Sequence, residues 1–229
     1  LNFCMSKMAR DNHLSNKIYI HDLSAYAVGM HNCLSIPFDH LLEKGFNTRQ
    51  ADIRPANSVD TAFQLLAVIF QLQSLQQFGG VSATHLDWTM VPYVRKSFWK
   101  HFMTGVKYFN TPEDYSYVAV NVLGDLNLGK VPIGAYQNLT VGQNEGAAAS
   151  LLLLTSAYKQ AYEYAMDMTI KETQQAVEGM YHNLNTLQSR SGNQLPFTSI
   201  NYGTCTLPEG RMVIKALLEG SLKGVGKHH

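Results

Sequence analysis

The sequence places one cysteine, Cys33, in a short polar stretch, HNCLS, just ahead of a helix-like run. A thiol can act as a nucleophile when its pKa is lowered, as a metal ligand, or as a hydrogen-atom donor because its S–H bond is weak. Cysteine is also among the most buried residue types and often serves only as a small apolar filler. His31, Asn32 and Ser35 give Cys33 a more polar setting than a filler requires, and the residues alone leave both interpretations open.

Two further patterns that resemble chemical motifs are weak. GDLNLGK at residues 124–130 has the glycine and lysine spacing of a phosphate-binding loop. However, Val131 stands where a magnesium-binding Ser or Thr is needed, and Pro132 would interrupt the helix that should face the phosphates. We interpret this segment as a turn. The nine histidines lack helical metal-binding spacing and the three cysteines form no CxxC, so the residues predict no metal site in this chain.

The composition is that of an ordinary globular protein with nearly balanced charge. The net charge of +1 gives no electrostatic signature of binding to nucleic acid or to an anionic membrane. No charged residue lies between Asp60 and Asp87, but five glutamines in that stretch argue against a membrane span. Three scattered cysteines and an N-terminus without signal-peptide order indicate a cytoplasmic protein.

The residue patterns predict long helices separated by short strands. A short strand or an extended entry segment is expected at residues 17–23, and a strand at 194–206. Residues 110–146 are expected to form loops with weak strands. Helices are expected at 37–44, 58–78, 88–109, about 147–188 with a break near Gly179, and 209–224. Strands so far apart in sequence predict an α/β fold.

The helices at 58–78 and 88–109 are predicted to form an antiparallel pair, because the loop between them is short. Asn57 or Ser58 can cap the first of them, with Asp60 in its first turn. Its apolar face is wide and its remaining surface carries glutamines rather than charges. We therefore expect it to be buried on most sides, within this chain or against a second copy.

The chain resembles the catalytic subunit of anaerobic (class III) ribonucleoside-triphosphate reductase, a glycyl-radical enzyme, over residues 17–109 and about 165–229. The matching strings include IYIHDL, GMHNCLSIPFDHLLEKGFNTRQADIRPANS, TAFQLLAVIFQLQSLQQFGG and NQLPFTSINYGTCTLPEGRMVIKALLEGSLKGVGKHH. Residues 113–155 match nothing in the family and are atypical. The resemblance implies that residues 1–229 are a single partial domain, the N-terminal half of a ten-stranded α/β barrel similar to that of pyruvate formate-lyase. It also implies that the helix pair at about 58–109 serves dimerisation and effector binding.

The resemblance implies a role for Cys33. In the family, a radical stored on a C-terminal glycine passes to a loop cysteine, whose thiyl radical removes the 3′ hydrogen of the ribose. A second cysteine donates hydrogen from the opposite face, the 2′ hydroxyl leaves as water, and formate supplies electrons. Cys33 matches this second cysteine, which favours the catalytic interpretation. Asn32, Ser35, Ser199 and Asn201 are implied as substrate-side polar groups, with a structural role at the barrel rim as the alternative.

Effector and cofactor expectations also come from the resemblance. Lys100 matches a cationic contact to a deoxynucleotide effector, and Arg54 and Asn57 lie in the matching loop, although their residue types vary from the family pattern. We expect no cofactor to bind in this chain, because the glycyl-radical motif, the thiyl loop and the four-cysteine zinc site are absent, as is an N-terminal ATP cone. The whole enzyme is expected to be a homodimer that uses a glycyl radical, formate, zinc and an iron–sulfur, S-adenosylmethionine-dependent activase.

The function predicted from these features is anaerobic reduction of ribonucleoside triphosphates to deoxyribonucleoside triphosphates. This chain would be an incomplete part that is inactive alone. Two alternatives remain: a non-catalytic nucleotide-binding dimerisation module, and a fragment of another glycyl-radical enzyme. The residues do not indicate which nucleotide is preferred.

Overall fold

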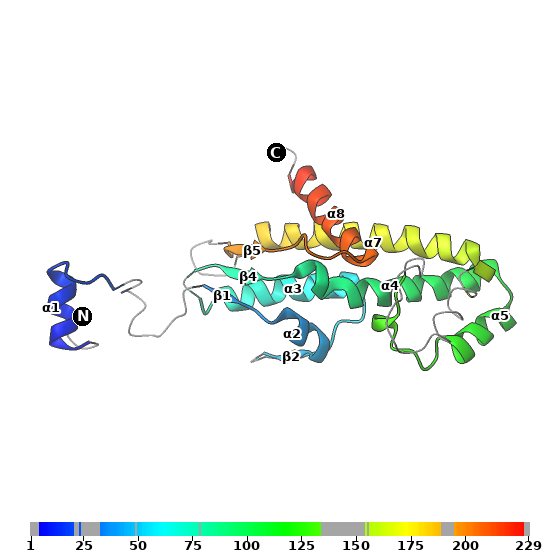
Figure 1. The fold of residues 1–229 in the computed structure, drawn as a ribbon, viewed down its shortest axis with the longest axis horizontal. Coiled ribbons are helices and arrows are strands. Elements are labelled where there is room, and N and C mark those ends of the chain that lie inside the picture. The colour runs from blue at the N-terminus through cyan, green and yellow to red at the C-terminus, as the bar shows by residue number, and fades with distance from the viewer. Residues whose placement is uncertain are drawn as a thin grey trace.

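The computed structural model describes residues 5–20, 23, 33–48, 50–77, 79–133, 154, 156–188 and 195–226. Three long helices lie lengthwise beside one another, with a small sheet at one end (Figure 1). They are α3 (Val59–Ser74), α4 (Leu86–Phe109) and α7 (Lys159–Thr186). α3 and α4 run in opposite directions, and α7 packs along both. Whether α3 and α4 serve dimerisation stays a prediction.

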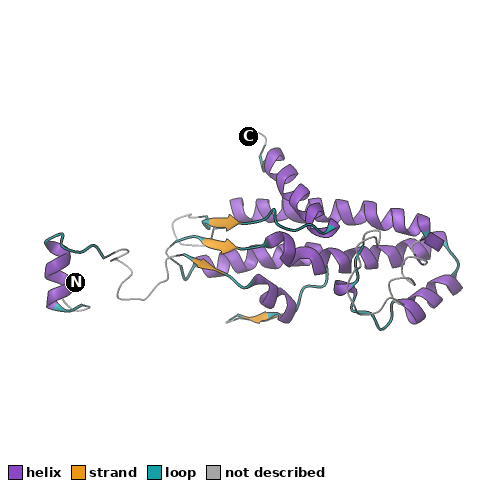
Figure 2. Ribbon diagram, viewed as in Figure 1, coloured by secondary structure: helices purple, strands orange, loops and turns teal. Residues whose placement is uncertain are grey.

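The sheet has three parallel strands in the order β1 (Leu34–Ser35), β4 (Val81–Ala83), β5 (Thr198–Ile200). Long helical segments separate these strands in sequence, as in α/β folds, and helix predominates over strand throughout (Figure 2). A separate antiparallel pair consists of β2 (Phe46–Asn47) and β3 (Asp52–Ile53). The mostly helical α/β class is as predicted, whereas the half barrel of a ten-stranded fold stays a prediction.

Local capping explains where several helices begin and end. The remaining described helical elements are α1 (Lys7–Leu14), α2 (Phe38–Lys44), α5 (Pro112–Tyr117), a π-helical turn η2 (Val118–Val122), a 3₁₀ turn η3 (Leu128–Lys130) and α8 (Pro208–Lys223). α2 follows Pro37 and ends at Gly45, whose φ of 76° suits glycine. α3 starts at Ser58, whose Oγ accepts a hydrogen bond from the Thr61 N–H at 3.2 Å. The predictions of α2, the Ser58 cap and α8 are confirmed.

The core is densest where α4 meets α7. α4 contributes three fully buried aromatic side chains, Phe98, Trp99 and Phe102. The two helices approach most closely at Gly105, where an added Cβ would lie 2.8 Å from the Cα of Ala161. A larger residue at either position would push the helices apart, so small side chains set the position of α7 over α4.

Of the two alternatives for residues 17–23, the strand is wrong for residues 17–20, which lie against the end of α1. The backbone N–H groups of Lys17 and Ile18 donate to the Asn12 carbonyl at 2.9 and 3.3 Å. The backbone N–H groups that would bond to a neighbouring strand are thus bonded to the end of α1 instead. Most of the remainder of this segment lies outside the described residues.

Two predictions about helix length were also wrong. α3 ends at Ser74, earlier than the predicted Phe78, and α7 continues through Gly179 without a break. The cost of a helical glycine, about 1 kcal/mol, is outweighed by the burial of neighbours such as Met180. The predicted start of this helix, near residue 147, lies outside the described residues.

Residues 110–133, predicted as loops with weak strands, contain helical turns and no strand within the part that the structure describes. Thr111 and Asp114 form a reciprocal capping box, in which each backbone N–H donates to the other side chain at 3.2 Å. Pro112 occupies the first turn of α5, where its missing N–H costs no hydrogen bond. The Thr111, Pro112 and Asp114 pattern of a helix start is present in the sequence, and the prediction of loops overlooked it.

Candidate functional site

Cys33 is exposed and stands immediately before β1. Cys33 itself lies in a bend of the chain, two residues before Ser35, which is the last residue of β1. The strand register pairs Ser35 with Ser82, and Ser82 with Ser199. Three serines therefore form a row across the sheet, and the β1 member of the row lies two residues after Cys33.

The same face remains polar toward the carboxyl ends of the strands. Two residues beyond the serine row lie Thr84 and Asn201. The Ser35 and Thr84 hydroxyl oxygens are 3.2 Å apart, and the Ser199 hydroxyl donates to the Asn201 side-chain oxygen at 3.5 Å. The opposite face of β4 is fully buried in the core. In β4, one face thus packs in the core, and the other face belongs to a row of exposed or partly exposed hydroxyl and amide groups.

The structure brings together most of the predicted substrate-side residues. Cys33, Ser35, Ser199 and Asn201 share one small sheet and all are exposed. Asn32 lies outside the described residues. Ser82 and Thr84 were missed, because nothing in the sequence shows which residues pair with Ser35 across strands that are distant in the chain.

The three predicted effector residues are exposed but are less clearly grouped. Arg54 and Asn57 lie between β3 and α3, and Lys100 lies on α4. The Val59 N–H donates to Ser97 Oγ at 2.9 Å, which brings the start of α3 to within one helical turn of Lys100. Within the described ranges, no hydrogen bond or ion pair joins the three side chains to one another.

A partly buried carboxylate near Lys100 was not predicted. Glu172 of α7 lies 2.7 Å from His101 Nε2 and accepts a hydrogen bond from the Ser97 hydroxyl at 3.1 Å. Burial would raise the pKa of Glu172, but the hydrogen bonds from His101 and Ser97 outweigh it and the pKa is lowered. Through Ser97, this carboxylate ties α7 and α4 to the first turn of α3.

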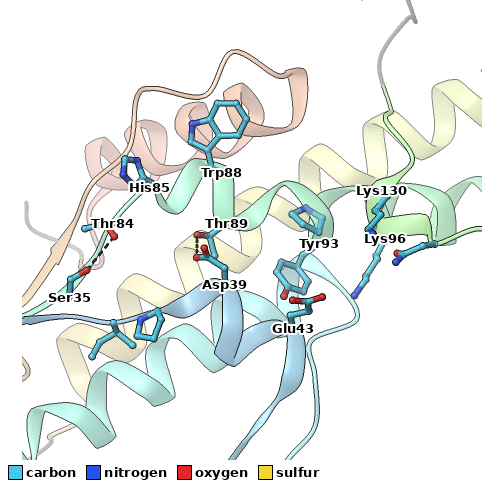
Figure 3. Close-up of a pocket in the computed structure, with 15 residues that line it drawn as sticks. Ser35, Asp39, Glu43, Thr84, His85, Trp88, Thr89, Tyr93, Lys96 and Lys130 are labelled. Carbon is cyan, nitrogen blue, oxygen red and sulfur yellow. Dashed lines mark hydrogen bonds between the residues drawn. The ribbon is translucent and has the colours of Figure 1, made fainter. Parts of the chain in front are cut away.

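A pocket of about 520 Å³ opens where β1 and β4 end (Figure 3). We call it the α2–α4 pocket, because those helices supply most of its walls. Ser35 and Thr84 lie at one end of it, Asp39 and Glu43 of α2 face it, and its further wall includes Trp88, Thr89, Tyr93, Lys96 and Lys130. Ser35, two residues after Cys33, thus belongs both to this pocket and to the serine row of the sheet.

The polar groups of the α2–α4 pocket lie in a partly desolvated setting. The Thr89 hydroxyl donates to Asp39 Oδ1 at 2.8 Å. Burial, with Glu43 and Asp39 nearby, raises the pKa of Tyr93 to about 12. Burial lowers the pKa of Lys96, whose Nζ donates to the Ala56 carbonyl at 3.2 Å and lies 5.1 Å from the Tyr93 ring centroid.

Asp87, fully buried in the first turn of α4, shapes the chain beyond β5. Its carboxylate accepts backbone hydrogen bonds from Gly203 at 2.9 Å, Cys205 at 2.8 Å and Trp88 at 3.1 Å. Burial would raise the pKa of Asp87, but these hydrogen bonds lower it below its ordinary value. A strand was predicted over residues 194–206, but β5 is only three residues long. The N–H groups of Gly203 and Cys205, beyond its end, bond to Asp87 and not to a neighbouring strand.

Cys205 has a different environment from Cys33. It is buried, burial raises the pKa of its thiol, and its sulfur packs directly against Gly210 of α8. A buried thiol with a raised pKa is unreactive as a nucleophile. Cys205 therefore matches the apolar-filler interpretation that the exposed Cys33 does not.

The weaker motifs gain no chemical role from the structure. In the GDLNLGK segment, η3 packs Gly129 against Pro92 and Lys96, which agrees with the predicted turn. Across the described ranges, no three His, Cys, Asp or Glu side chains are grouped to hold a metal ion. Within the same ranges, every helix is too short or too polar to cross a membrane.

Comparison with known proteins identifies relatives of this chain. A family model described as anaerobic ribonucleoside-triphosphate reductase matches residues 1–229. The chain is 25% identical over 216 residues to a protein of that name from Enterobacteria phage T4, covering 94% of this chain and 28% of the phage protein. It is also 25% identical to proteins of that name from Haemophilus influenzae and Escherichia coli, covering 95% and 94% of this chain and 24% of each relative. The chain thus spans about a quarter of the length of the curated relatives it matches.

Proposed function

Because the chain belongs to the anaerobic ribonucleoside-triphosphate reductase family, we propose that it forms the part of such an enzyme that presents the hydrogen-donor cysteine to the substrate. The substrate is a ribonucleoside triphosphate and the product is the deoxyribonucleoside triphosphate. One observation carries the assignment: Cys33 is exposed beside a row of polar residues on a parallel sheet that opens into a pocket. A sulfur buried in a dry apolar environment could not serve this role.

Cys33 would act by donating one hydrogen atom. Its S–H bond breaks, a C–H bond forms on a carbon radical of the ribose, and the sulfur keeps the unpaired electron. The donor must reach the sugar directly, which the exposure of Cys33 allows. Ser35, Ser199 and Asn201, with Asn32, would orient the ribose, because hydroxyl and amide groups can both donate to and accept from sugar hydroxyls.

The regulatory part of the proposal concerns α3 and α4. Arg54, Asn57 and Lys100 would contact a nucleotide effector, with Lys100 as a cation for its phosphates. Glu172 supports this assignment, because it fixes the first turn of α3 to the part of α4 that carries Lys100. Leu72 and Leu75, 37% and 52% exposed on the uncharged stretch of α3 and just beyond it, would be covered by a second copy in a homodimer.

The remaining machinery would lie in other parts of the enzyme. The glycyl radical, the loop cysteine that forms the thiyl radical and a zinc site would belong to the region that the longer relatives have and this chain does not span. Formate would be the reductant, and an iron–sulfur, S-adenosylmethionine-dependent activase would generate the radical. The enzyme would work in the cytoplasm under anaerobic conditions.

Complementation tests the proposal. The chain is mixed anaerobically with a C-terminal half of a reductase, the activase, formate and a ribonucleoside triphosphate, and deoxynucleotide formation is measured by chromatography. We expect wild type to give product and Cys33→Ala to give none. Cys205→Ala is the matched control, because it removes a buried thiol away from the polar face, and it is expected to keep turnover.

Two outcomes would contradict the assignment. Product formation by Cys33→Ala equal to that of wild type would remove the donor role and favour a non-catalytic nucleotide-binding module. Equal loss in Cys33→Ala and Cys205→Ala, with both variants folded by circular dichroism, would show that the assay does not report the exposed sulfur.

A further inference from the structure

We propose that the α2–α4 pocket binds the triphosphate of a nucleotide as its magnesium complex. The identity of that nucleotide as the reductase substrate rests on the proposed function, whereas the phosphate and magnesium chemistry rests on the pocket itself. Three observations support the proposal: the place of the pocket at the sheet, the arrangement of its charges, and a hydroxyl on the pocket wall that makes no described hydrogen bond.

The pocket lies where ligands of parallel sheets usually bind. In open α/β folds, ligand sites form beyond the carboxyl ends of the parallel strands, where side chains of neighbouring connections meet. The pocket opens beyond the last residues of β1 and β4, and Ser35, two residues after Cys33, forms one end of it with Thr84 (Figure 3). A nucleotide whose ribose lies at Cys33 can therefore extend its phosphates along the pocket.

The charges of the pocket are separated rather than paired. Asp39 and Glu43 are four residues apart on α2 and so share one face of that helix. Lys96 and Lys130 come from α4 and η3, at the other end of the pocket. Among the described residues, neither carboxylate forms an ion pair with either lysine, and the ion pair of Glu43 is a long one of 3.8 Å to its neighbour Lys44.

A bare triphosphate would bind the lysines but would be repelled by the carboxylates. Magnesium removes this conflict, because proteins commonly bind Mg²⁺ through one or two carboxylates together with the phosphates of a nucleotide. Asp39 still has one carboxylate oxygen beyond the hydrogen bond from Thr89, which occupies Oδ1. The combination of two carboxylates and two ammonium groups thus matches a magnesium triphosphate better than either ion alone.

Tyr93 supplies an independent indication of a ligand. Its side chain is only 3% exposed and lines the pocket, and Figure 3 shows its hydroxyl directed toward the carboxylates of Asp39 and Glu43. In the part of the chain that the structure describes, no hydrogen bond engages this hydroxyl. The hydroxyl oxygen itself is not fully buried, so it faces the pocket space and is open to a hydrogen-bond partner from a ligand. An oxygen of a bound phosphate, or a water of its magnesium ion, would provide one.

Calorimetric titration of the full chain tests the proposal, with magnesium tripolyphosphate as the probe. Trp88 gives a second signal, because it lines the pocket and is 43% exposed, whereas the other tryptophan, Trp99, is fully buried. We expect saturable binding with a change in Trp88 fluorescence, and loss of binding when EDTA removes magnesium. No saturable binding, or equal binding with and without magnesium, would overturn the proposal.

Variants locate the site. Lys130→Ala should weaken binding by about tenfold or more, because one charged contact to phosphate is lost. Lys130 is exposed and its side chain makes no described hydrogen bond, so the fold should tolerate the change. Lys107→Ala removes the same charge from the exposed end of α4, outside the pocket, and should stay within about twofold of wild type. Equal affinity of Lys130→Ala and wild type would overturn the proposal.

Tyr93→Phe and Cys33→Ala separate this inference from the proposed function. Tyr93→Phe removes only the hydroxyl, so it should weaken magnesium tripolyphosphate binding while the melting temperature stays at or above that of wild type. Cys33→Ala should abolish turnover in complementation but leave tripolyphosphate binding intact. Unchanged binding in Tyr93→Phe would contradict the pocket assignment even if Cys33→Ala abolishes turnover, whereas an active Cys33→Ala would contradict only the proposed function.

Discussion

The backbone N–H of Cys205 donates a hydrogen bond of 2.8 Å to the carboxylate of Asp87, a residue 118 positions earlier in the chain. This contact and its equivalent from Gly203 fix the segment after β5 to the start of α4. The same segment holds Thr204, whose hydroxyl accepts a hydrogen bond of 3.0 Å from the Trp88 indole. Asp87 is therefore a positioning residue for the carboxyl end of the sheet, where Asn201 and the α2–α4 pocket lie.

Asp87→Asn should destabilise the protein by about 1.5–3 kcal/mol, the range for losing hydrogen bonds to a charged group. The amide can keep one acceptor oxygen, but its NH₂ group would face backbone donors. The free energy of unfolding, measured with urea at neutral pH, gives the size of the loss. Asp125→Asn changes the same charge at an exposed turn and should be nearly neutral. A loss as large in Asp125→Asn would show that net charge, rather than the buried contacts, causes the effect.

The stabilisation from Asp87 should depend on pH. The pKa of Asp87 is lowered in the folded protein below its ordinary value of 3.8. A lowered carboxyl pKa stabilises the fold above the unfolded-state pKa, and this contribution disappears as pH falls through the native pKa. The difference in unfolding free energy between wild type and Asp87→Asn should therefore be constant near neutral pH and shrink below about pH 4. Urea titrations at several pH values measure it, and a difference that grows on acidification would contradict the assignment.

Gly210→Ala should destabilise α8, because the position of the added Cβ is occupied by the sulfur of Cys205. Overpacking of this kind costs about 1–3 kcal/mol. Gly179→Ala is the matched control, since Gly179 lies in α7 with no atom within 4 Å of its added Cβ. That substitution should stabilise the helix by up to about 1 kcal/mol. The melting temperatures of Gly210→Ala, Gly179→Ala and wild type, measured by thermal unfolding, test both expectations.

The double variant Gly210→Ala with Cys205→Ala tests the cause of the effect. Removal of the sulfur should relieve the overlap, so the two changes together should cost less than the sum of their separate costs. Strict additivity of the two melting-temperature changes would mean that the Cβ added at Gly210 does not overlap the sulfur of Cys205.

Much of the helical part of the fold could be predicted, because its signals are local. Pro37 and Gly45 bracket α2, and Ser58 caps α3 within a few residues of the apolar pattern it starts. The sheet could not be assembled in this way. The pairing of Leu34 with Val81, and of Val81 with Thr198, depends on packing of helices between them, and no short motif encodes it.

The candidate site was predictable in its residues but not in its geometry. The polar neighbours of Cys33 and the family resemblance singled out the sulfur, yet the serine row and the α2–α4 pocket exist only because distant segments meet. Asp39 and Tyr93 illustrate this, since neither residue type is unusual for its helix. Their proximity to Lys96 and Ser35 follows from how α2 lies against α4.

The apolar surface at the end of α3 yields a test of the proposed homodimer. Leu72 and Leu75 are 37% and 52% exposed, on a stretch of chain that carries no charge. If a second copy covers them, Leu72→Lys or Leu75→Lys should raise the dimer dissociation constant by about tenfold or more, because a buried charge would lack a partner. Sedimentation equilibrium measures this constant.

The matched control for the dimer is Leu222→Lys, which makes the same change at an 82% exposed position on α8. It should leave the dissociation constant unchanged, because an already solvated side chain loses little on becoming charged. An equal shift in Leu222→Lys would point to a general charge effect or to α8 as the interface. Wild-type protein that stays monomeric across the concentration range would contradict the homodimer, since Leu72 and Leu75 would then face water in the native state.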